Sequence, residues 1–349
     1  MAYISFQPSD FFNVNLWTGN STTDRAMTGI GFQPDFLWNK SRNETYDHHL
    51  QDAVRGSTTY IDSNDTGINA TNAEGVKSFN ADGFTLGNAN DWNQTAKTYV
   101  GWSWKAGTTT GIVTTGSTIT PTGYSFNQTS GFSVIAYTGN ATAGATIPHG
   151  LGVAPDMILV KNTQTAEAWA CYFKPLGNTK VLTLNATNAE LTQAQWNNTS
   201  PTSTLFSVGS GGNTNLSQTH VAYCFANKKG YSKMGSYTGN GNADGTFVYT
   251  GFRPAYVMIK ASSIAGDSWN IYDDKRPSTY EGNVVTELLE ADTGNATLTN
   301  ASFNIDILSN GFKCKGNESG INQNAAEYIF AAFAEFPLVS SNSKAGTAR

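Results

Sequence analysis

One sequence pattern occurs three times in this chain and constrains its fold more than any other feature. Each copy has an aromatic residue followed by Thr-Gly-Asn, then a Gly-x-x-Pro segment that leads into an apolar run ending in lysine. The aromatic residues are Trp17, Tyr137 and Tyr237, the prolines are Pro34, Pro155 and Pro254, and the lysines are Lys40, Lys161 and Lys260. The aromatic-to-proline spacing is 17, 18 and 17 residues, and every lysine follows its proline by six. Matched spacing of this kind indicates internal repeats of one structural unit.

The composition favours short strands joined by tight turns and does not suit long helices. The chain of 349 residues has 35 glycines and is only 13% charged, while 19 Phe, 15 Tyr and 8 Trp give it a large apolar area to bury. Gly, Asn and Asp tolerate the positive φ angles of tight turns. We therefore predict an all-β chain of three tandem homologous β-sandwich-like domains of about 100 residues each. A single closed three-bladed structure is the alternative.

The repeats also set the predicted boundaries. We expect domain 1 with its lead-in at residues 1–107, a Thr/Gly-rich linker with room for one strand at 108–131, domain 2 at 132–231, domain 3 at 232–339 and a flexible tail at 340–349. Each repeat closes with an expected aromatic strand, at residues 99–104, 220–225 and 328–333. The sharpest helix candidate covers residues 283–290.

The net charge of the chain and its lack of recognisable targeting signals argue against several classes of function. The net charge of −5 and pI near 5.4 argue against binding to a phosphate backbone, which needs clustered Lys and Arg. No apolar stretch is long enough for a membrane span, and the N-terminus lacks the pattern of a secretory signal. We expect no cofactor, no nucleic-acid partner and no membrane insertion. Cys171, Cys224 and Cys314 lack metal-type spacing and are predicted to be buried free thiols.

Two tryptophans are candidates for ligand contact. Trp92 is followed by Asn93, and Trp196 by Asn197, in polar stretches that are expected to be loops. Binding residues concentrate on loops, and an exposed indole beside amide groups is typical of surfaces that stack sugar rings. We predict that these four residues bind a ligand. An interdomain or intermolecular interface is the alternative.

A charged pair recurs in two of the three repeats. Asp52 precedes Arg55 by three residues, and Asp273 precedes Arg276 by the same interval, whereas the second repeat has Phe173 at the aspartate position. A planar guanidinium can grip a carboxylate with two hydrogen bonds and fix a turn. Because one repeat lacks the pair, we predict structural ion pairs and not a catalytic role.

Adjacent histidines, His48 and His49, lie next to Asp47 and superficially suggest a metal or acid–base site. Neighbouring residues in a strand face opposite ways, so the two rings cannot readily bind one ion. The other repeats have Trp169 and Trp269 in the corresponding stretch, both expected in the core. We therefore predict no metal site.

A group of carboxylates near the third repeat raises the possibility of glycoside hydrolysis, which uses two carboxylates across a cleft. The group comprises Asp273, Asp274, Glu281, Glu287 and Glu290. Acidic residues at this density are usually a solvated face, and no nucleophile-elbow motif or Cys/His arrangement accompanies them. The sequence therefore predicts no catalytic residues.

Several segments of this chain resemble the repeated β domains of phage virion proteins. They are residues 6–12, residues 16–20, the Gly-Phe-x-Pro strands and the closing segment 100–105. Such domains are most familiar from tail-fibre and related structural proteins of marine phages. The resemblance covers nearly the whole chain and implies a virion location and a surface-exposed, adhesive role. This chain has no coiled coil or collagen-like shaft, so a compact knob, a fibre tip or a capsid decoration protein fits better than a shafted fibre.

We therefore predict a non-enzymatic virion structural protein that forms a surface appendage and binds host-surface glycans. Its expected partners are other virion proteins and copies of itself, with a trimer among the possible homo-oligomers. Made in the host cytoplasm, it would be exposed outside cells after lysis. A capsid decoration protein is the alternative, and a phage polysaccharide depolymerase is a third hypothesis.

Overall fold

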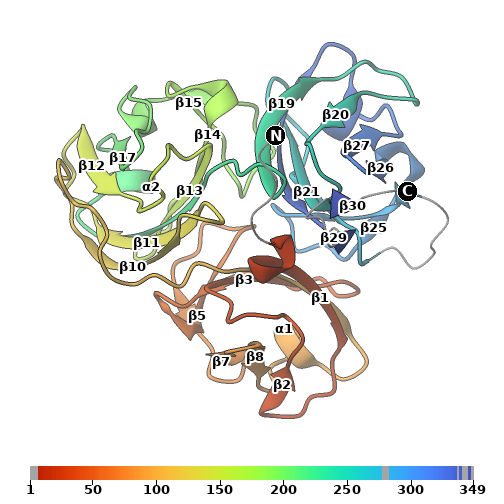
Figure 1. The fold of residues 1–349 in the computed structure, drawn as a ribbon, viewed down its shortest axis with the longest axis horizontal. Coiled ribbons are helices and arrows are strands. Elements are labelled where there is room, and N and C mark those ends of the chain that lie inside the picture. Colours follow the sequence, from red (N-terminus) through yellow and green to blue (C-terminus); the bar gives the residue numbers. More distant parts are fainter. Residues whose placement is uncertain (1–6, 277–282, 336–337, 340–344, 347–349) are drawn as a thin grey trace.

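The computed structural model describes residues 7–276, 283–335, 338–339 and 345–346 as three lobes around a common centre (Figure 1). Each lobe contains one large antiparallel sheet and additional short strands. Within the described residues, α-helix is limited to α1 (Asn90–Asn93), α2 (Gly212–Asn215) and α3 (Ser319–Asn322). The 3₁₀ turns are η1 (Pro8–Asp10), η2 (Lys174–Leu176), η3 (Ala194–Trp196) and η4 (Ala301–Phe303). The predicted all-β class is confirmed.

The first lobe has a large sheet of order β1-β9-β3-β4-β5-β6 and a small sheet of order β2-β8-β7. Its strands are β1 (Phe12–Thr18), β2 (Arg25–Met27), β3 (Phe36–Ser41), β4 (His49–Asp52), β5 (Gly56–Asp62), β6 (Ala70–Thr71), β7 (Val76–Asn80), β8 (Gly83–Leu86) and β9 (Thr98–Trp104).

The second lobe has a large sheet of order β10-β11-β18-β13-β14 and the pairs β12-β17 and β15-β16. Its strands are β10 (Pro121–Asn127), β11 (Phe132–Thr138), β12 (Ala145–Pro148), β13 (Met157–Asn162), β14 (Ala170–Phe173), β15 (Lys180–Val181), β16 (Leu191–Thr192), β17 (Leu205–Val208) and β18 (Thr219–Phe225). Strand β10 lies within residues 108–131, the segment expected to be a linker with room for one strand, and it pairs with β11.

The third lobe has a large sheet of order β19-β28-β21-β22-β24-β25 and a second sheet of order β20-β27-β26-β23. Its strands are β19 (Ser232–Thr238), β20 (Phe247–Tyr249), β21 (Pro254–Ala261), β22 (Asn270–Asp273), β23 (Val284–Val285), β24 (Glu287–Glu290), β25 (Leu298–Thr299), β26 (Ile305–Leu308), β27 (Gly311–Cys314) and β28 (Glu327–Ala334). Of the expected tail, β30 (Ala345–Gly346) is described and pairs with β29 (Leu338–Val339).

The large sheets share one strand order. Four neighbouring strands follow the same order in each large sheet: β1-β9-β3-β4, β11-β18-β13-β14 and β19-β28-β21-β22. The closing strands expected from the sequence are β9, β18 and β28. Each Thr-Gly-Asn motif begins at the last residue of β1, β11 or β19, and a Cβ on Gly139 would lie 2.0 Å from the carbonyl oxygen of Leu216. This close approach requires glycine.

The three lobes meet at a triad of aromatic rings. Trp104, Phe225 and Phe333 occupy the same register position in the closing strands, opposite Phe36, Met157 and Tyr256 respectively. Their ring centroids are 6.1 Å apart for Trp104 and Phe225, 5.4 Å for Trp104 and Phe333, and 5.7 Å for Phe225 and Phe333, all edge to face. Edge-to-face aromatic pairs add stability beyond the area that they bury.

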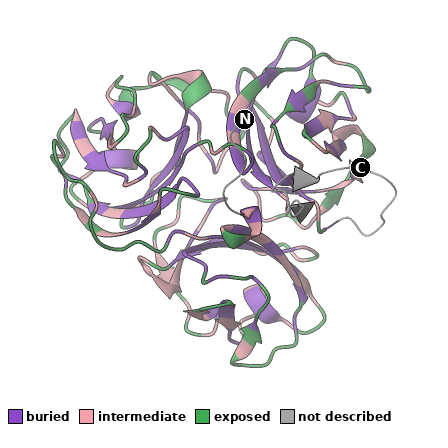
Figure 2. Ribbon diagram, in the orientation of Figure 1, coloured by how far each residue is buried: buried purple, intermediate pink, exposed green. Residues whose placement is uncertain are grey.

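The central strands of the large sheets, β3, β13 and β21, are buried along their whole length (Figure 2). In β21, Tyr256 and Met258 face the core shared by the three lobes, whereas Val257 and Ile259 face a second core inside the third lobe. This alternation is the period of two that a strand imposes. The lobes therefore share one core, as expected for the closed three-bladed alternative, and each adds a core of its own.

Backbone hydrogen bonds join the lobes in a closed ring. The N–H of Asn69 donates to the carbonyl of Thr163 at 3.1 Å, that of Glu190 to Ser262 at 2.8 Å, and that of Thr297 to Arg42 at 2.8 Å. The third bond connects the last lobe to the first in the same way as the other two bonds connect neighbours. Equivalent backbone hydrogen bonds therefore link each lobe to the next around the ring.

The expectation of a helix at residues 283–290 is wrong. This segment forms β23 and β24, and neighbouring side chains enter opposite cores: Leu288 packs in the core of the third lobe and Leu289 in the shared core. A helix would place both on nearby faces, so burial on two sides selects the strand. The predicted free thiols Cys171, Cys224 and Cys314 are confirmed as buried and unpaired.

Candidate functional site

Trp92 and Asn93 lie in α1 and are buried, so the prediction of an exposed ligand-binding loop is wrong for both. The Trp92 indole stacks on the imidazole of His49, with centroids 4.2 Å apart, and contacts Tyr60 edge to face at 5.3 Å. Its Nε1 lies 3.5 Å from Oε1 of Gln51. With its faces covered in this way, Trp92 stabilises the core of the first lobe.

Trp196 is also buried, at 1% exposure, and the ligand-binding prediction is wrong for it too. Its indole N–H donates to the carbonyl of Lys180 at 3.1 Å, and its ring packs edge to face on Tyr172 at 5.6 Å. Asn197 is half-buried and ends η3 with a left-handed backbone, φ 49°. Trp196 and Asn197 lie in a different lobe from Trp92 and Asn93, so the structure does not bring the four together.

Three buried asparagines form a repeated clasp that the sequence analysis missed. The Oδ1 atom of Asn215 accepts from the N–H of Asn140 at 2.9 Å, and its Nδ2 donates to the carbonyls of Thr142 and Gly209 at 2.8 and 2.7 Å. The same contacts are made by Asn93 with Asn20, Thr22 and Gly87, and by Asn322 with Asn240, Asn242 and Gly316. The clasp fixes the loop after each Thr-Gly-Asn motif. Aligning the repeats on the residue before each clasp, which is Trp92, Thr214 or Ile321, would have indicated burial of Trp92.

Both predicted ion pairs are present and buried. Nε of Arg55 lies 2.6 Å from Oδ2 of Asp52, and Nε of Arg276 lies 2.5 Å from Oδ2 of Asp273. Each arginine also donates to a backbone carbonyl two residues before its aspartate, at 2.9 and 2.7 Å. These contacts fix the turn and engage both carboxylates.

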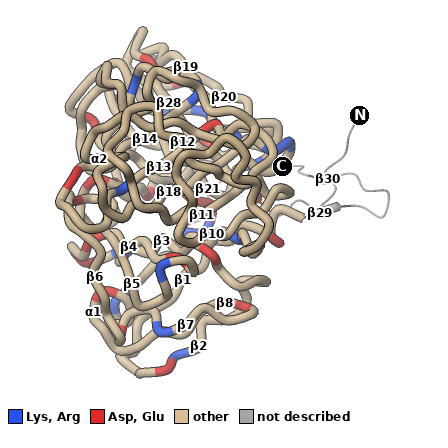
Figure 3. The backbone as a smooth tube through the Cα atoms, turned by 90° about the vertical axis from the view of Figure 1, so that its left-hand side faces the viewer, with Lys and Arg blue, Asp and Glu red and all other residues tan. Residues whose placement is uncertain are grey.

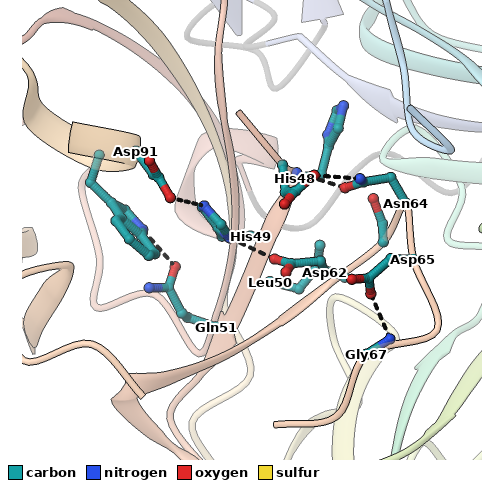
Figure 4. A network of polar contacts seen from close by, with 12 residues as sticks. His48, His49, Leu50, Gln51, Asp62, Asn64, Asp65, Gly67 and Asp91 are labelled. Atoms are coloured by element: carbon teal, nitrogen blue, oxygen red, sulfur yellow. Dashed lines mark hydrogen bonds and ion pairs between the residues drawn. The ribbon is translucent and has the colours of Figure 1, made fainter. Parts of the chain in front are cut away.

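His49 is the centre of a polar network in the first lobe (Figure 4). Its Nδ1 lies 2.6 Å from Oδ1 of Asp62, and its Nε2 lies 3.4 Å from Oδ2 of Asp91. Burial lowers the pKa of His49, but the hydrogen bonds and charges of the two carboxylates outweigh it, and the net pKa is raised. The network therefore favours an imidazolium held between two carboxylates.

His48 faces the other way, as expected for adjacent residues in a strand. Nε1 of Trp38 donates to its Nδ1 at 2.9 Å, which places the ring proton on Nε2. Burial lowers the pKa of His48 well below its usual value, and Lys40 adds to this effect. The pKa values of these two adjacent histidines are thus shifted in opposite directions. Among the described residues, no group of three or more His, Cys, Asp or Glu side chains is placed to hold a metal ion.

The acidic residues grouped in the sequence near the third repeat make separate contacts in the structure. Asp273 is bound by Arg276, Glu287 pairs with Arg42 of the first lobe at 3.1 Å, and Glu290 accepts from Thr293 at 3.2 Å. Glu281 lies outside the described residues. Asp274 is the exception, because its Oδ1 is buried and has no hydrogen-bond partner among the residues that the structure describes.

Asp274 borders a hollow of about 460 Å³ between the first and third lobes. Apolar side chains including Phe12 and Val14 line it together with the polar Asn13, Lys275 and Glu335. The carboxylate of Asp274 is 5% exposed and its Oδ2 lies 3.7 Å from Nζ of Lys275. Burial raises the pKa of Asp274 to about 7, partly offset by the charge of Lys275.

The three repeat lysines are buried and cap backbone carbonyls. Nζ of Lys161 donates to the carbonyls of Glu167 at 2.7 Å and of Thr66, in the first lobe, at 2.9 Å. Burial lowers the pKa of Lys40, Lys161 and Lys260 to about 8. This shared role accounts for the equal spacing from proline to lysine in the three repeats.

The comparisons with known proteins give a family and no close relative. The family described as Domain of unknown function (DUF7483) matches residues 7–337. No curated protein and no solved structure matches the chain. No helix among the described residues is long and apolar enough to cross a membrane.

Proposed function

Since this chain belongs to the family described as Domain of unknown function (DUF7483), we propose its role from its own structure: a non-enzymatic structural protein carried on the surface of a phage particle. The observation that carries the proposal is the closed ring of three lobes over one aromatic core. Lobes that share one core and are linked by backbone hydrogen bonds resist local opening. This property suits a protein that works outside cells.

The ionisable side chains inside the protein make structural contacts, which supports this proposed role. The repeat lysines cap carbonyls, the aspartate–arginine pairs fix turns, and His49 is held between two carboxylates. These groups stabilise the fold, as expected of a scaffold. Basic and acidic residues are interspersed along the backbone (Figure 3), and only 13% of all residues are charged, which leaves Asn, Thr and Ser as the main polar groups for contact with partners.

The path of the chain gives the proposed attachment end. Ser9, near the first described residue, and Glu335, near the end of β28, line the same hollow. The chain thus enters and leaves the ring at one end. We place the contact with the particle at that end.

The test is electron microscopy of intact particles labelled with an antibody raised against this chain, with an antibody against the major head protein as the control. Label on tails or fibres would support a surface appendage. Even label over the head would replace the appendage with a decoration protein. Particles that carry the control label and not the first would overturn the proposal.

A further inference from the structure

Strand β20 is an edge strand of the second sheet in the third lobe, whose order is β20-β27-β26-β23. The carbonyl of Thr246 accepts an N–H from β27 at 3.0 Å, and the N–H of Thr250 donates to the residue before β27 at 2.9 Å. Because bonding alternates along an antiparallel strand, the N–H and C=O groups of Phe247 and Tyr249 point away from β27. Nζ of Lys233 donates to the carbonyl of Tyr249 at 2.7 Å, which agrees with this direction.

The second lobe bonds to the equivalent edge with its own chain. Thr146 in β12 corresponds to Phe247, because each precedes the residue that pairs with a phenylalanine of the next strand. The N–H groups of Thr118 and Ile119 both donate to the carbonyl of Thr146 at 3.1 Å, and its own N–H donates to Oγ1 of Thr118 at 2.8 Å. In one lobe, therefore, this edge already binds a further segment of backbone.

The third lobe carries apolar side chains at this edge. Proteins usually protect edge strands with charges or with a covering segment. In the first lobe, Asp24 precedes the corresponding strand β2 and is 67% exposed, and the small Ala26 takes the place of Phe247. Strand β20 instead exposes Phe247 and Tyr249, at 44% and 58%, on one face. An uncharged edge of this kind favours pairing with another strand.

We propose that two copies of this chain associate through β20, paired antiparallel about a two-fold axis at Val248. In this register Phe247 of one copy lies opposite Tyr249 of the other, and the two residues exchange both backbone hydrogen bonds. The side chains of the same two residues form cross-strand aromatic pairs. The carbonyl of Tyr249 can accept from both Lys233 and the second copy, because a carbonyl oxygen has two lone pairs.

Self-complementarity selects a second copy as the occupant of this edge. Phe247 and Tyr249 are the only aromatic side chains exposed among the described residues, so β20 itself is the strand that offers a matching face. Charge does not oppose the pairing. Lys313, beside Phe247 in the sheet, is bound by Asp244 at 2.7 Å, and the two copies of Lys233 lie at opposite ends of the paired strands.

The test is sedimentation equilibrium of the purified chain from about 10 μM to about 1 mM. We expect a reversible monomer–dimer equilibrium, and Phe247→Lys should raise its Kd about tenfold or more, because an edge lysine opposes strand pairing. Leu298→Lys is the matched control, since Leu298 is 39% exposed in β25, an edge strand of the other sheet in this lobe. A wild-type chain that stays monomeric throughout, or an equal loss in the control, would overturn the proposal.

Engineered cysteines test the register. Opposite residues of a hydrogen-bonded antiparallel pair have Cα atoms about 5.5 Å apart, which a disulfide can span. The Phe247→Cys and Tyr249→Cys proteins would be oxidised separately and as a mixture. We expect the disulfide between positions 247 and 249 in the mixture to exceed either like-with-like disulfide, and the buried native cysteines should not compete. Equal yields in all three samples would overturn the two-fold pairing at Val248.

Discussion

Tyr223 of the second lobe donates a hydrogen bond of 2.8 Å to Oδ2 of Asp52 in the first lobe, so one lobe completes the ion pair of its neighbour. The indole N–H of Trp102 does the same for Asp273, at 3.1 Å. At the third interface the aspartate position holds Phe173 and the donor position holds Ala331, both in the shared core. Donor and acceptor therefore change together, and the missing ion pair has a physical reason.

Removing the Tyr223 hydroxyl should destabilise the ring. In Tyr223→Phe, Asp52 keeps Arg55 but loses a buried hydrogen bond to a charged group, which is worth about 1.5–3 kcal/mol. Urea unfolding would measure the loss. Tyr124→Phe serves as control, because the Tyr124 hydroxyl accepts only a 3.4 Å contact from Ile112; equal stability loss in both variants would contradict a specific role for Tyr223.

The asparagine clasp predicts a second large effect. Asn215→Ala would remove the bond accepted from the N–H of Asn140 and the two bonds donated to the carbonyls of Thr142 and Gly209. We expect a loss of about 2–4 kcal/mol in the free energy of unfolding, measured in guanidinium chloride. The exposed Ser217→Ala, two residues away, should change it by less than about 0.5 kcal/mol. A clasp variant as stable as the control would show that water replaces these contacts.

Much of the fold was predictable because the repeat fixes equivalent positions. The aromatic strands and both aspartate–arginine pairs follow from residue type and spacing alone. The exposure expected for Trp92 and Trp196 is wrong because amide side chains flank both residues, a composition typical of loops. In the structure, Asn93 is buried and makes the clasp contacts. The shared core had a weak signal: Met157-Ile158-Leu159-Val160 is a continuous apolar run, which indicates burial on both faces. Contacts between lobes, such as that of Tyr223 with Asp52, join residues far apart in the chain and leave no local pattern.

His49 should make stability depend on pH near neutrality. Its pKa is raised in the folded chain, so the stabilisation is complete below the unfolded value of about 6.5 and is lost as the pH rises through the folded value. NMR titration of the ring proton would measure the folded pKa. Asp91→Asn should lower it because one of the two carboxylates is gone. The exposed Asp82→Asn in the same lobe should leave it unchanged; no change in either variant would contradict the proposed imidazolium.

The buried lysines should make the stability rise with pH at higher pH, which is opposite in sign to the effect of His49. Burial lowers the pKa of Lys161 to about 8, so between about pH 8 and 10 the unfolded chain binds more protons and stability rises with pH. Lys161→Met should flatten this rise and cost about 2–4 kcal/mol at pH 7, because the carbonyls of Thr66 and Glu167 lose their donor. Thermal unfolding across this pH range would test both effects. Lys174→Met, at a lysine 62% exposed, is the control. A Lys161 variant that kept the wild-type pH slope would assign the slope to other groups and remove Lys161 as its source.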